Sequence, residues 1–231
     1  MKRLCVVLIL AMAVCLLGGC NIIKIDGQGD SSAEPTPHNA IATTDPSADP
    51  DRMPVATILF SSGDKIEITL LPQIAPNTVC NFIYLANGGF YDGSKVDGVV
   101  GSCIVKFGET AGDTGYTIPG EFSANGYQPN DYVFSHRRGV VSMTRQTSAE
   151  NDKAYYNSAS SGFFILSDSV PELDSFYAAF GIIFDEESLA VLDRLAAEEV
   201  NADYTLKKNV FIESVRVETF GVTFADPVVI K

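Results

Sequence analysis

The sequence predicts a mainly β protein, a closed or nearly closed β-barrel capped by two helices. Many short runs of strand-forming residues are separated by clusters of Gly, Asn, Asp and Ser, whereas only two segments have the spacing of an amphipathic helix. Of the 231 residues, 46% are apolar and 19% are charged, so the chain has ample apolar material for a folded core. Many short strands with few helices favour a barrel over a layered α/β fold.

The first predicted elements are a strand at residues 65–70 and a helix at residues 75–88. The strand alternates strictly between apolar and polar residues, and residues 61–64 before it have the composition of a hairpin turn. In the helix, Pro76 lies in the first turn and Gly88-Gly89 end the pattern. The apolar face of this helix consists of Val79, Phe82, Ile83 and Ala86.

The later elements complete a domain at residues 53–220. Short β-rich runs are found at residues 99–107, 139–144, 162–166 and 178–184. A second helix begins near Asp185, its expected N-cap, with acidic residues in the first turn that favour the helix dipole. Its buried face consists of Leu189, Leu192 and Leu195. A strand at residues 210–219 closes the domain, and residues 221–231 are a short tail.

The first twenty residues have the pattern of an export signal. Lys2-Arg3 precede an apolar run at residues 4–17, which is shorter than the roughly 20 residues that a membrane span needs. The ending Leu17-Gly18-Gly19-Cys20 resembles a bacterial lipobox, which implies removal of residues 1–19 and attachment of lipid to Cys20. The alternative is an ordinary signal peptide with an incidental cysteine. We therefore expect a protein anchored by lipid to the extracytoplasmic face of the cell membrane.

Residues 20–52 are expected to be a disordered tether rich in Pro, Ser and Asp. Between residues 28 and 52 there are four prolines and a single large aliphatic residue, Ile41, which is too little apolar surface to order the segment. As a flexible coil, a tether of this length has a reach of about 30 Å. The domain would therefore work close to the membrane.

Charge and composition exclude some classes of function. The chain has 16 basic and 29 acidic residues, a formal net charge of −13, which repels nucleic acid. The largest basic cluster is Arg137-Arg138, so we expect no nucleic-acid partner. The two histidines, His38 and His136, are not spaced as metal ligands, and no metal or cofactor is expected.

Five collinear motifs resemble those of bacterial cyclophilins, the cyclosporin-binding type of peptidyl-prolyl isomerase. The similarity covers residues 54–220. The motifs are Phe90-Tyr91-Asp92-Gly93, residues 115–122, His136 to Met143, Asn157 to Ile165, and Leu173-Asp174 with residues 177–181. The resemblance implies an eight-stranded antiparallel barrel with a helix closing each end. It also implies a monomer without cofactors that acts on proline-containing segments of unfolded or exported proteins.

Proline isomerisation makes modest chemical demands on a protein. An Xaa-Pro bond isomerises in tens to hundreds of seconds unaided, because amide resonance must be broken. A site must hold the proline ring in an apolar pocket, exclude water and direct a donor at the prolyl amide nitrogen. In the family, the pocket is aromatic and aliphatic, and the donor is an arginine supported by a glutamine.

Several family site positions are retained here or changed only mildly. Phe164 falls on the pocket phenylalanine and Leu173 on the pocket leucine. Tyr177 takes a position that is histidine or tyrosine in the family, and Ile104 takes one that is usually methionine. Thr144-Arg145 fall on the edge segment that pairs with the substrate backbone. The resemblance thus implies a retained proline pocket.

Five departures concentrate on one patch. The family's catalytic arginine is Gly98, and a pocket phenylalanine is Cys103. The supporting glutamine is Lys106, a second glutamine is Gly162, and the residue before the pocket leucine, often aromatic, is Glu172. Because glycine has no donor, the family mechanism cannot run unaltered, and loss of one such donor lowers rates by roughly 10²–10³-fold. We also expect these changes to weaken cyclosporin binding.

The residues of this patch leave alternatives open. Lys106 is either a partial replacement for the arginine or a solvated surface lysine. Cys103 is either a redox-reactive thiol or a small buried hydrophobe, and we expect Cys80 and Cys103 to be free thiols. His136 is read as non-catalytic because no serine nucleophile motif accompanies it.

Three functional hypotheses follow. The first is a peptidyl-prolyl isomerase of reduced efficiency that assists folding of exported proteins. The second is a membrane-anchored proline-binding or chaperone module that lost turnover, which Gly98 and Gly162 favour. The third, a structural envelope lipoprotein, explains the barrel but not the retained pocket.

Overall fold

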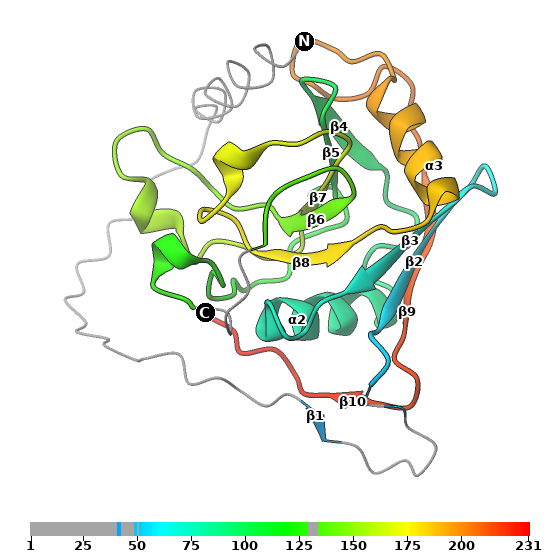
Figure 1. The fold of residues 1–231 in the computed structure, drawn as a ribbon. Coiled ribbons are helices and arrows are strands. Elements are labelled where there is room, and N and C mark those ends of the chain that lie inside the picture. The colour runs from blue at the N-terminus through cyan, green and yellow to red at the C-terminus, as the bar shows by residue number, and fades with distance from the viewer. Residues whose placement is uncertain (1–40, 43–48, 50, 129–133) are drawn as a thin grey trace.

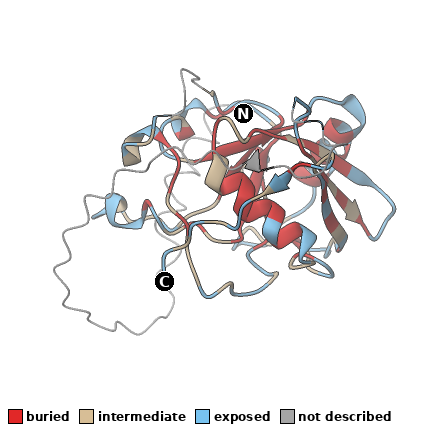
Figure 2. Ribbon diagram, turned by 90° about the horizontal axis from the view of Figure 1, so that it is seen from below, coloured by how far each residue is buried: buried red, intermediate tan, exposed pale blue. Residues whose placement is uncertain are grey.

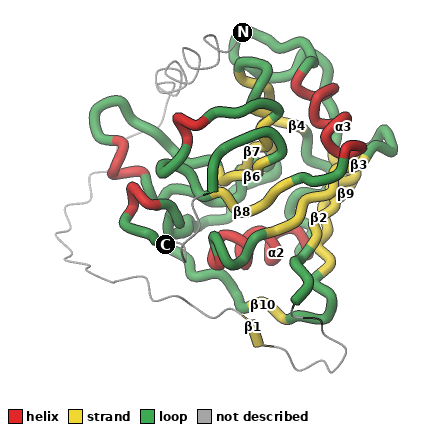
Figure 3. The backbone as a smooth tube through the Cα atoms, in the orientation of Figure 1, coloured by secondary structure: helices red, strands yellow, loops and turns green. Residues whose placement is uncertain are grey.

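The computed structural model describes residues 41, 42, 49, 51–128 and 134–231, and the predicted signal peptide, Cys20 and most of the tether lie outside them. Eight strands form one antiparallel sheet in the order β4-β5-β7-β6-β8-β3-β2-β9. The strands are β2 (Val55–Phe60), β3 (Lys65–Leu70), β4 (Val96–Val100), β5 (Ile104–Phe107), β6 (Val140–Met143), β7 (Phe163–Leu166), β8 (Ala179–Ile182) and β9 (Ile212–Glu218). The two helices are α2 (Pro76–Asn87) and α3 (Glu186–Ala196), and much of the chain between β5 and β7 is loop (Figures 1 and 3).

The sheet is a curled half-barrel, so the prediction of a closed barrel was wrong. The edge strands β4 and β9 do not form a ladder with each other. They meet only through an isolated bridge between Lys95 and Phe211 and through backbone hydrogen bonds beside it. A ladder is prevented because the chain before β9 turns back on itself, with its own bridge between Val200 and Leu206. This turn lies along β4, where the backbone amide of Val99 donates to the carbonyl of Tyr204 at 3.0 Å.

The predicted elements are confirmed with small shifts of their ends. The strand at residues 65–70 and the helix over residues 75–88 are β3 and α2. Asp185 is the N-cap of α3 and accepts from the backbone amide of Ser188 at 2.7 Å. The run at residues 99–107 is two strands rather than one, because Gly101 and Ser102 have positive φ and turn the chain between β4 and β5.

One face of the sheet and both helices enclose the main core. Helix α2 packs against β9 and β8, and α3 packs against β3 and β5. The centre of this core is aromatic: the rings of Phe107 and Phe163 stack at 5.1 Å, and Phe82 meets Phe163 edge-on at 5.3 Å. The helices thus close the concave side of the half-barrel.

The opposite face carries a second buried cluster. Strands β4, β6, β7 and β8 are buried along their whole length, so both of their faces are covered. Figure 2 shows buried residues running through much of the sheet. We call this second set the outer-face cluster: Leu71, Ile74, Val100, Cys103, Ile104, Val140, Phe164, Leu166, Val170, Leu173, Ala179 and Ile182. Phe134, Tyr177 and Tyr204 pack against it.

The C-terminal segment is held along the domain. Strand β10 (Thr223–Phe224) pairs with β1 (Ile41–Ala42), which comes from the predicted tether. Further along, the side-chain amide of Asn77 exchanges two hydrogen bonds with the backbone of Val228, at 2.7 and 3.0 Å. Residues 223–231 therefore run across α2 and brace its N-terminal end.

Candidate functional site

The strand register places the predicted site residues in two rows on the outer face. One row is Gly98, Lys106, Phe164, Ser142 and Ala179, on β4, β5, β7, β6 and β8. The neighbouring row begins with Val100, Ile104 and Leu166. Residues paired across strands point to the same face, so Gly98, Lys106, Ile104 and Phe164, four of the predicted site residues, lie on one surface.

The aromatic part of the site is centred on Phe164. Its ring is 4% exposed and meets the ring of Tyr177 edge-on at a centroid distance of 5.6 Å. Leu173, Ile104 and Cys103 belong to the same cluster. The structure therefore brings five predicted binding residues together: Cys103, Ile104, Phe164, Leu173 and Tyr177. Such a wall of aromatic and aliphatic side chains suits an apolar ring.

Cys103 corrects one expectation. Of the two cysteines in the described part of the domain, Cys80 is free and buried. Cys103 is disulfide-bonded, so the prediction of a free thiol at this position was wrong. Cys103 is nevertheless buried in the outer-face cluster, as the alternative of a small buried hydrophobe predicts.

His136 stacks beside Phe164, with ring centroids 6.4 Å apart, and belongs to a buried hydrogen-bond network that the sequence did not reveal. Its Nδ1 is 2.8 Å from Asp174 Oδ1, and its Nε2 is 2.9 Å from Ser142 Oγ. Burial lowers the pKa of His136, against the opposing effect of Asp174. The neutral ring donates from Nδ1 to the carboxylate and accepts from the Ser142 hydroxyl. These residues have the order of a hydrolytic triad, but Ser142 is fully buried, so we assign the network a structural role.

Arg145 is held inside the loop beside the pocket. Its side chain is 4% exposed and binds Asp152 with two nitrogens, at 2.8 and 2.7 Å. Its guanidinium also lies 4.7 Å from the centroid of the Tyr177 ring. The side chain is thus committed to the protein, and the backbone amide of Thr144 also donates to the carbonyl of Gly162 at 2.9 Å.

Gly98, which the sequence analysis assigns to the family's arginine position, is covered by the protein backbone. A Cβ built on Gly98 would overlap the carbonyl oxygen of Tyr204 and lie 3.0 Å from the carbonyl carbon. Gly98 is buried, on a strand edge beside a sharp register shift. No side chain at residue 98 can therefore reach the pocket without moving the loop that contains Tyr204.

Lys106 and Gly162, which the sequence analysis assigns to the family's two glutamine positions, have different surroundings. Lys106 is 20% exposed, and its Nζ lies 2.8 and 2.9 Å from the two carboxylate oxygens of Glu109. A Cβ built on Gly162 would overlap Thr144 Oγ1 and lie 3.0 Å from Glu109 Cγ. Glu172 is exposed in the short helical turn that contains Leu173. Thus Thr144 and Glu109 occupy the space above Gly162, and Lys106 is an ion-paired residue at the margin of the site.

Sequence reasoning missed Tyr204, Ser142 and Asp174 as neighbours of the site. Ser142 and Asp174 lie within quoted motifs, and their side-chain roles could be found only once β6 and the loop after Pro171 were placed together. Tyr204 lies outside every motif, and no sequence signal points to it.

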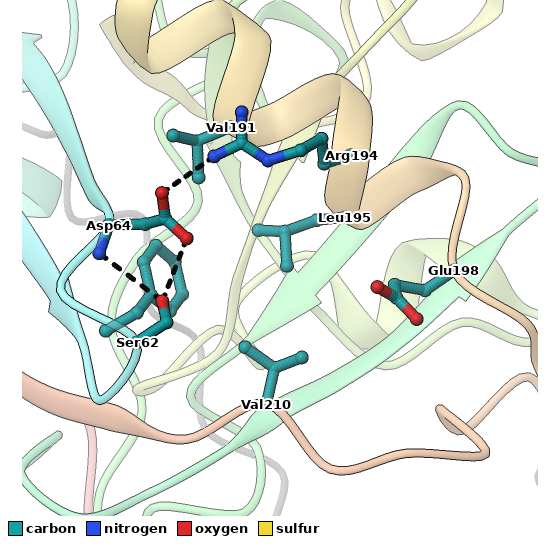
Figure 4. A pocket seen from close by; sticks show the side chains of 8 residues that line it. Ser62, Asp64, Val191, Arg194, Leu195, Glu198 and Val210 are labelled. Atoms are coloured by element: carbon teal, nitrogen blue, oxygen red, sulfur yellow. Dashed lines mark hydrogen bonds and ion pairs between the residues drawn. The ribbon is translucent and has the colours of Figure 1, made fainter.

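A different cavity, of about 190 Å³, lies at the end of the half-barrel beside α3 (Figure 4). Its apolar floor includes Val191, Leu195 and Val210, and an ion pair between Arg194 and Asp64 at 2.7 Å lies at its rim. None of the predicted site residues lines it. In the part of the chain that the structure describes, no helix is long and apolar enough to cross a membrane, and no cluster of His, Cys, Asp and Glu could hold a metal ion.

Comparisons with known proteins agree with the fold and the motifs. The sequence profile of a family described as cyclophilin type peptidyl-prolyl cis-trans isomerase/CLD matches residues 55–217. Peptidyl-prolyl cis-trans isomerase B of Bacillus subtilis is 34% identical over 133 residues, which are 56% of this chain and 82% of that protein. A peptidyl-prolyl cis-trans isomerase of Synechococcus elongatus is 33% identical over 144 residues, 60% of this chain and 86% of that protein.

Among solved structures, a cyclophilin type peptidyl-prolyl cis-trans isomerase of Cryptosporidium parvum, crystallised in the presence of the dipeptide Ala-Pro, superposes with a TM-score of 0.55. It is 20% identical, and the match covers 71% of this chain and 98% of that one. At this identity the likeness concerns the fold alone.

Proposed function

The chain belongs to the cyclophilin-type peptidyl-prolyl cis-trans isomerase family, and from this premise we propose that it is a slow isomerase of proline-containing segments of exported proteins. The observation that carries the proposal is the outer-face cluster, in which Phe164, Leu173 and Tyr177 form one apolar wall. Because Gly98 supplies no donor and cannot be extended toward the pocket, the rate should be reduced.

Binding the proline ring apart from water would still favour the twisted amide, in which resonance is lost and charge separation falls. A donor to the prolyl nitrogen would add to this effect. Lys106 is the cation next to the position of the missing arginine, since it pairs across the strands with Gly98. Its Nζ contacts both oxygens of the Glu109 carboxylate, and because an ammonium carries three N–H groups, a further N–H can turn toward the substrate.

The test is exchange spectroscopy on an Xaa-Pro peptide with the full-length chain. We expect catalysed exchange slower than that of a family member that has the arginine. Lys106→Ala should lower the remaining rate by roughly tenfold or more if the ammonium acts as the donor. Lys106→Met, which keeps the apolar stem, should be equally slow. A rate that is unchanged in both variants would refute the role of Lys106.

A second candidate is a binding module without turnover. The two glycines at arginine and glutamine positions favour it, because both are covered by the protein's own atoms. Peptide binding without any catalysed exchange would establish this alternative. Absence of both binding and exchange would refute both candidates.

We also propose lipid anchoring through Cys20 at the extracytoplasmic face, with the domain working as a monomer. The support is the sequence pattern of residues 2–20. Expression with radiolabelled fatty acid should label the wild-type chain but not Cys20→Ser. Equal labelling of the variant, or a mature N-terminus elsewhere, would contradict the proposal.

A further inference from the structure

Residues 200–206, which we call the Tyr204 loop, form a tightly bonded turn beside β4. The backbone amide of Asn201 donates to the carbonyl of Thr205 at 2.8 Å, and that of Tyr204 donates to Asn201 at 3.0 Å. Asp203 Oδ1 accepts from the hydroxyl of Thr205 at 2.7 Å. The loop is therefore built by its own polar residues, and its conformation does not depend on a ligand.

Tyr204 has a backbone conformation that is unfavourable for its type. Its φ is +67°, in the left-handed region, which is sterically unfavourable for a residue with a bulky side chain. Glycine would fit this position without strain. At residue 204 the protein thus has a tyrosine, although the backbone conformation favours glycine.

The aromatic side chain of Tyr204 packs against the outer-face cluster, to which the pocket residues belong. The loop is fixed to the β4 edge because Tyr204 O accepts from Val99 N and covers Gly98. Tyr204 therefore lies beside Gly98, at the β4 side of the outer-face cluster, where the resemblance places the family arginine. Within the described residues, its hydroxyl makes no hydrogen bond, and the side chain is half-buried.

We propose that Tyr204 is a substrate-binding residue, whose ring forms the wall of the peptide groove on the β4 side in place of the missing arginine. This inference rests on the proposed function. The loop excludes an arginine at residue 98, and its own side chain gives the peptide an apolar contact there instead. Aromatic rings contribute large contact areas at low cost in side-chain entropy, and they dominate such binding sites.

The test measures the dissociation constant of an Xaa-Pro peptide by NMR titration of the full-length chain. Tyr204→Gly removes the ring and relieves the left-handed strain, so stability should be kept while binding weakens at least fivefold. Tyr204→Phe keeps the ring and should bind within twofold of the wild type. Phe220→Gly is a matched control, because Phe220 also has positive φ, at 52°, and packs with Arg52 away from the outer-face cluster.

Two failures can be told apart. If the wild type binds the peptide and Tyr204→Gly binds equally well, the inference about Tyr204 is overturned while the proposed function stands. The same conclusion follows if Tyr204→Phe is as weak as Tyr204→Gly, or if Phe220→Gly weakens binding equally. If the wild type does not bind the peptide, the proposed function falls and the inference falls with it.

Discussion

Gly98 and Gly162 are the positions at which the resemblance predicts long polar side chains in the family, and they are covered in different ways. The space at Gly98 is taken by the backbone of Tyr204, which cannot be shortened by substitution. The space at Gly162 is taken mainly by the side chain of Thr144, and a substitution can shorten this side chain. The two sites therefore differ in how far the family's residues could be restored.

Substitution of each glycine by alanine should distinguish obstruction by backbone, at Gly98, from obstruction by a side chain, at Gly162. Gly98→Ala should lower the free energy of unfolding by about 1–3 kcal/mol, because the backbone must move. Gly162→Ala should be destabilising in the wild type but markedly less so in a Thr144→Ala background, since the overlapping hydroxyl is then absent. Urea unfolding of the four variants measures both effects. Equal costs of Gly162→Ala in the two backgrounds would contradict this account.

His136 should make stability depend on pH below neutrality. Its folded pKa is lowered by burial, so in acid the unfolded state takes up the proton first. The stabilisation is fully present above the ordinary histidine pKa of about 6.5 and is lost as pH falls toward the folded pKa. Buried Glu121 acts in the opposite direction. Desolvation raises its folded pKa, so the folded state takes up this proton before the unfolded state does, and the contribution of Glu121 to the unfolding free energy grows as pH falls.

The histidine contribution is isolated by comparing variants. Between pH 7 and pH 5, the unfolding free energy of the wild type should fall relative to that of His136→Gln. The difference between the two proteins removes the effect of Glu121, which both retain. Parallel curves for wild type and variant in urea titrations at each pH would show that His136 does not titrate in this way.

At the scale of elements, helix α2 begins without a cap of its own. Ala75 at its N-cap position provides no side-chain acceptor. Instead, Glu121 from a distant loop accepts from the backbone amides of Asn77 and Thr78, at 3.0 and 2.7 Å, and from the Thr78 hydroxyl at 2.6 Å. A carboxylate at a helix N-terminus also interacts favourably with the helix dipole.

Removal of this remote cap should cost more than removal of an ordinary one. Glu121→Ala leaves two amides and a buried hydroxyl unpaired, so we expect a loss of about 2–4 kcal/mol. Asp185→Ala removes the local cap of α3 and should cost about 1 kcal/mol. Thermal and urea unfolding of both variants compare the two. A smaller loss for Glu121→Ala than for Asp185→Ala would contradict the assignment.

The elements that sequence predicted well are those whose signals are local. The alternation of residues 65–70 predicted β3, and Pro76 and Asp185 predicted the starts of α2 and α3. These three signals depend only on residues that are neighbours along the chain. The closure of the sheet was mispredicted because it depends on the Tyr204 loop, about 100 residues beyond β4. The glycines at residues 98 and 162 led to the prediction that donors are missing, but the surroundings of both residues are set by tertiary packing.

At the scale of the whole molecule, the C-terminal segment joins both ends of the described chain to α2. Strand β10 pairs with β1, and the guanidinium of Arg52 lies 3.5 Å from the centroid of the Phe220 ring. The segment then passes Cys80, where the backbone of Ala225 favours the thiolate and lowers the pKa, against the larger opposing effect of burial. The C-terminal segment thus runs over α2 and ties the chain before β2 to this helix of the half-barrel.

Deletion of residues 223–231 should make Cys80 reactive. In the intact chain, burial and the nearby Glu121 carboxylate raise the pKa of the Cys80 thiol to about 11, so the nucleophilic thiolate is scarce. Without the segment, solvent reaches the sulfur and its pKa should fall toward the ordinary value of about 8.5, which raises the thiolate fraction at pH 8 by roughly 10²-fold. Iodoacetamide labelling, followed by mass spectrometry of the peptide that contains Cys80, measures the rate.

Asn77→Ala, which removes only the two hydrogen bonds to Val228, should give an intermediate rate, since it loosens the segment without deleting it. A truncated chain that keeps its circular dichroism spectrum and labels at the wild-type rate would mean that α2 packing alone, and not the C-terminal segment, protects the thiol.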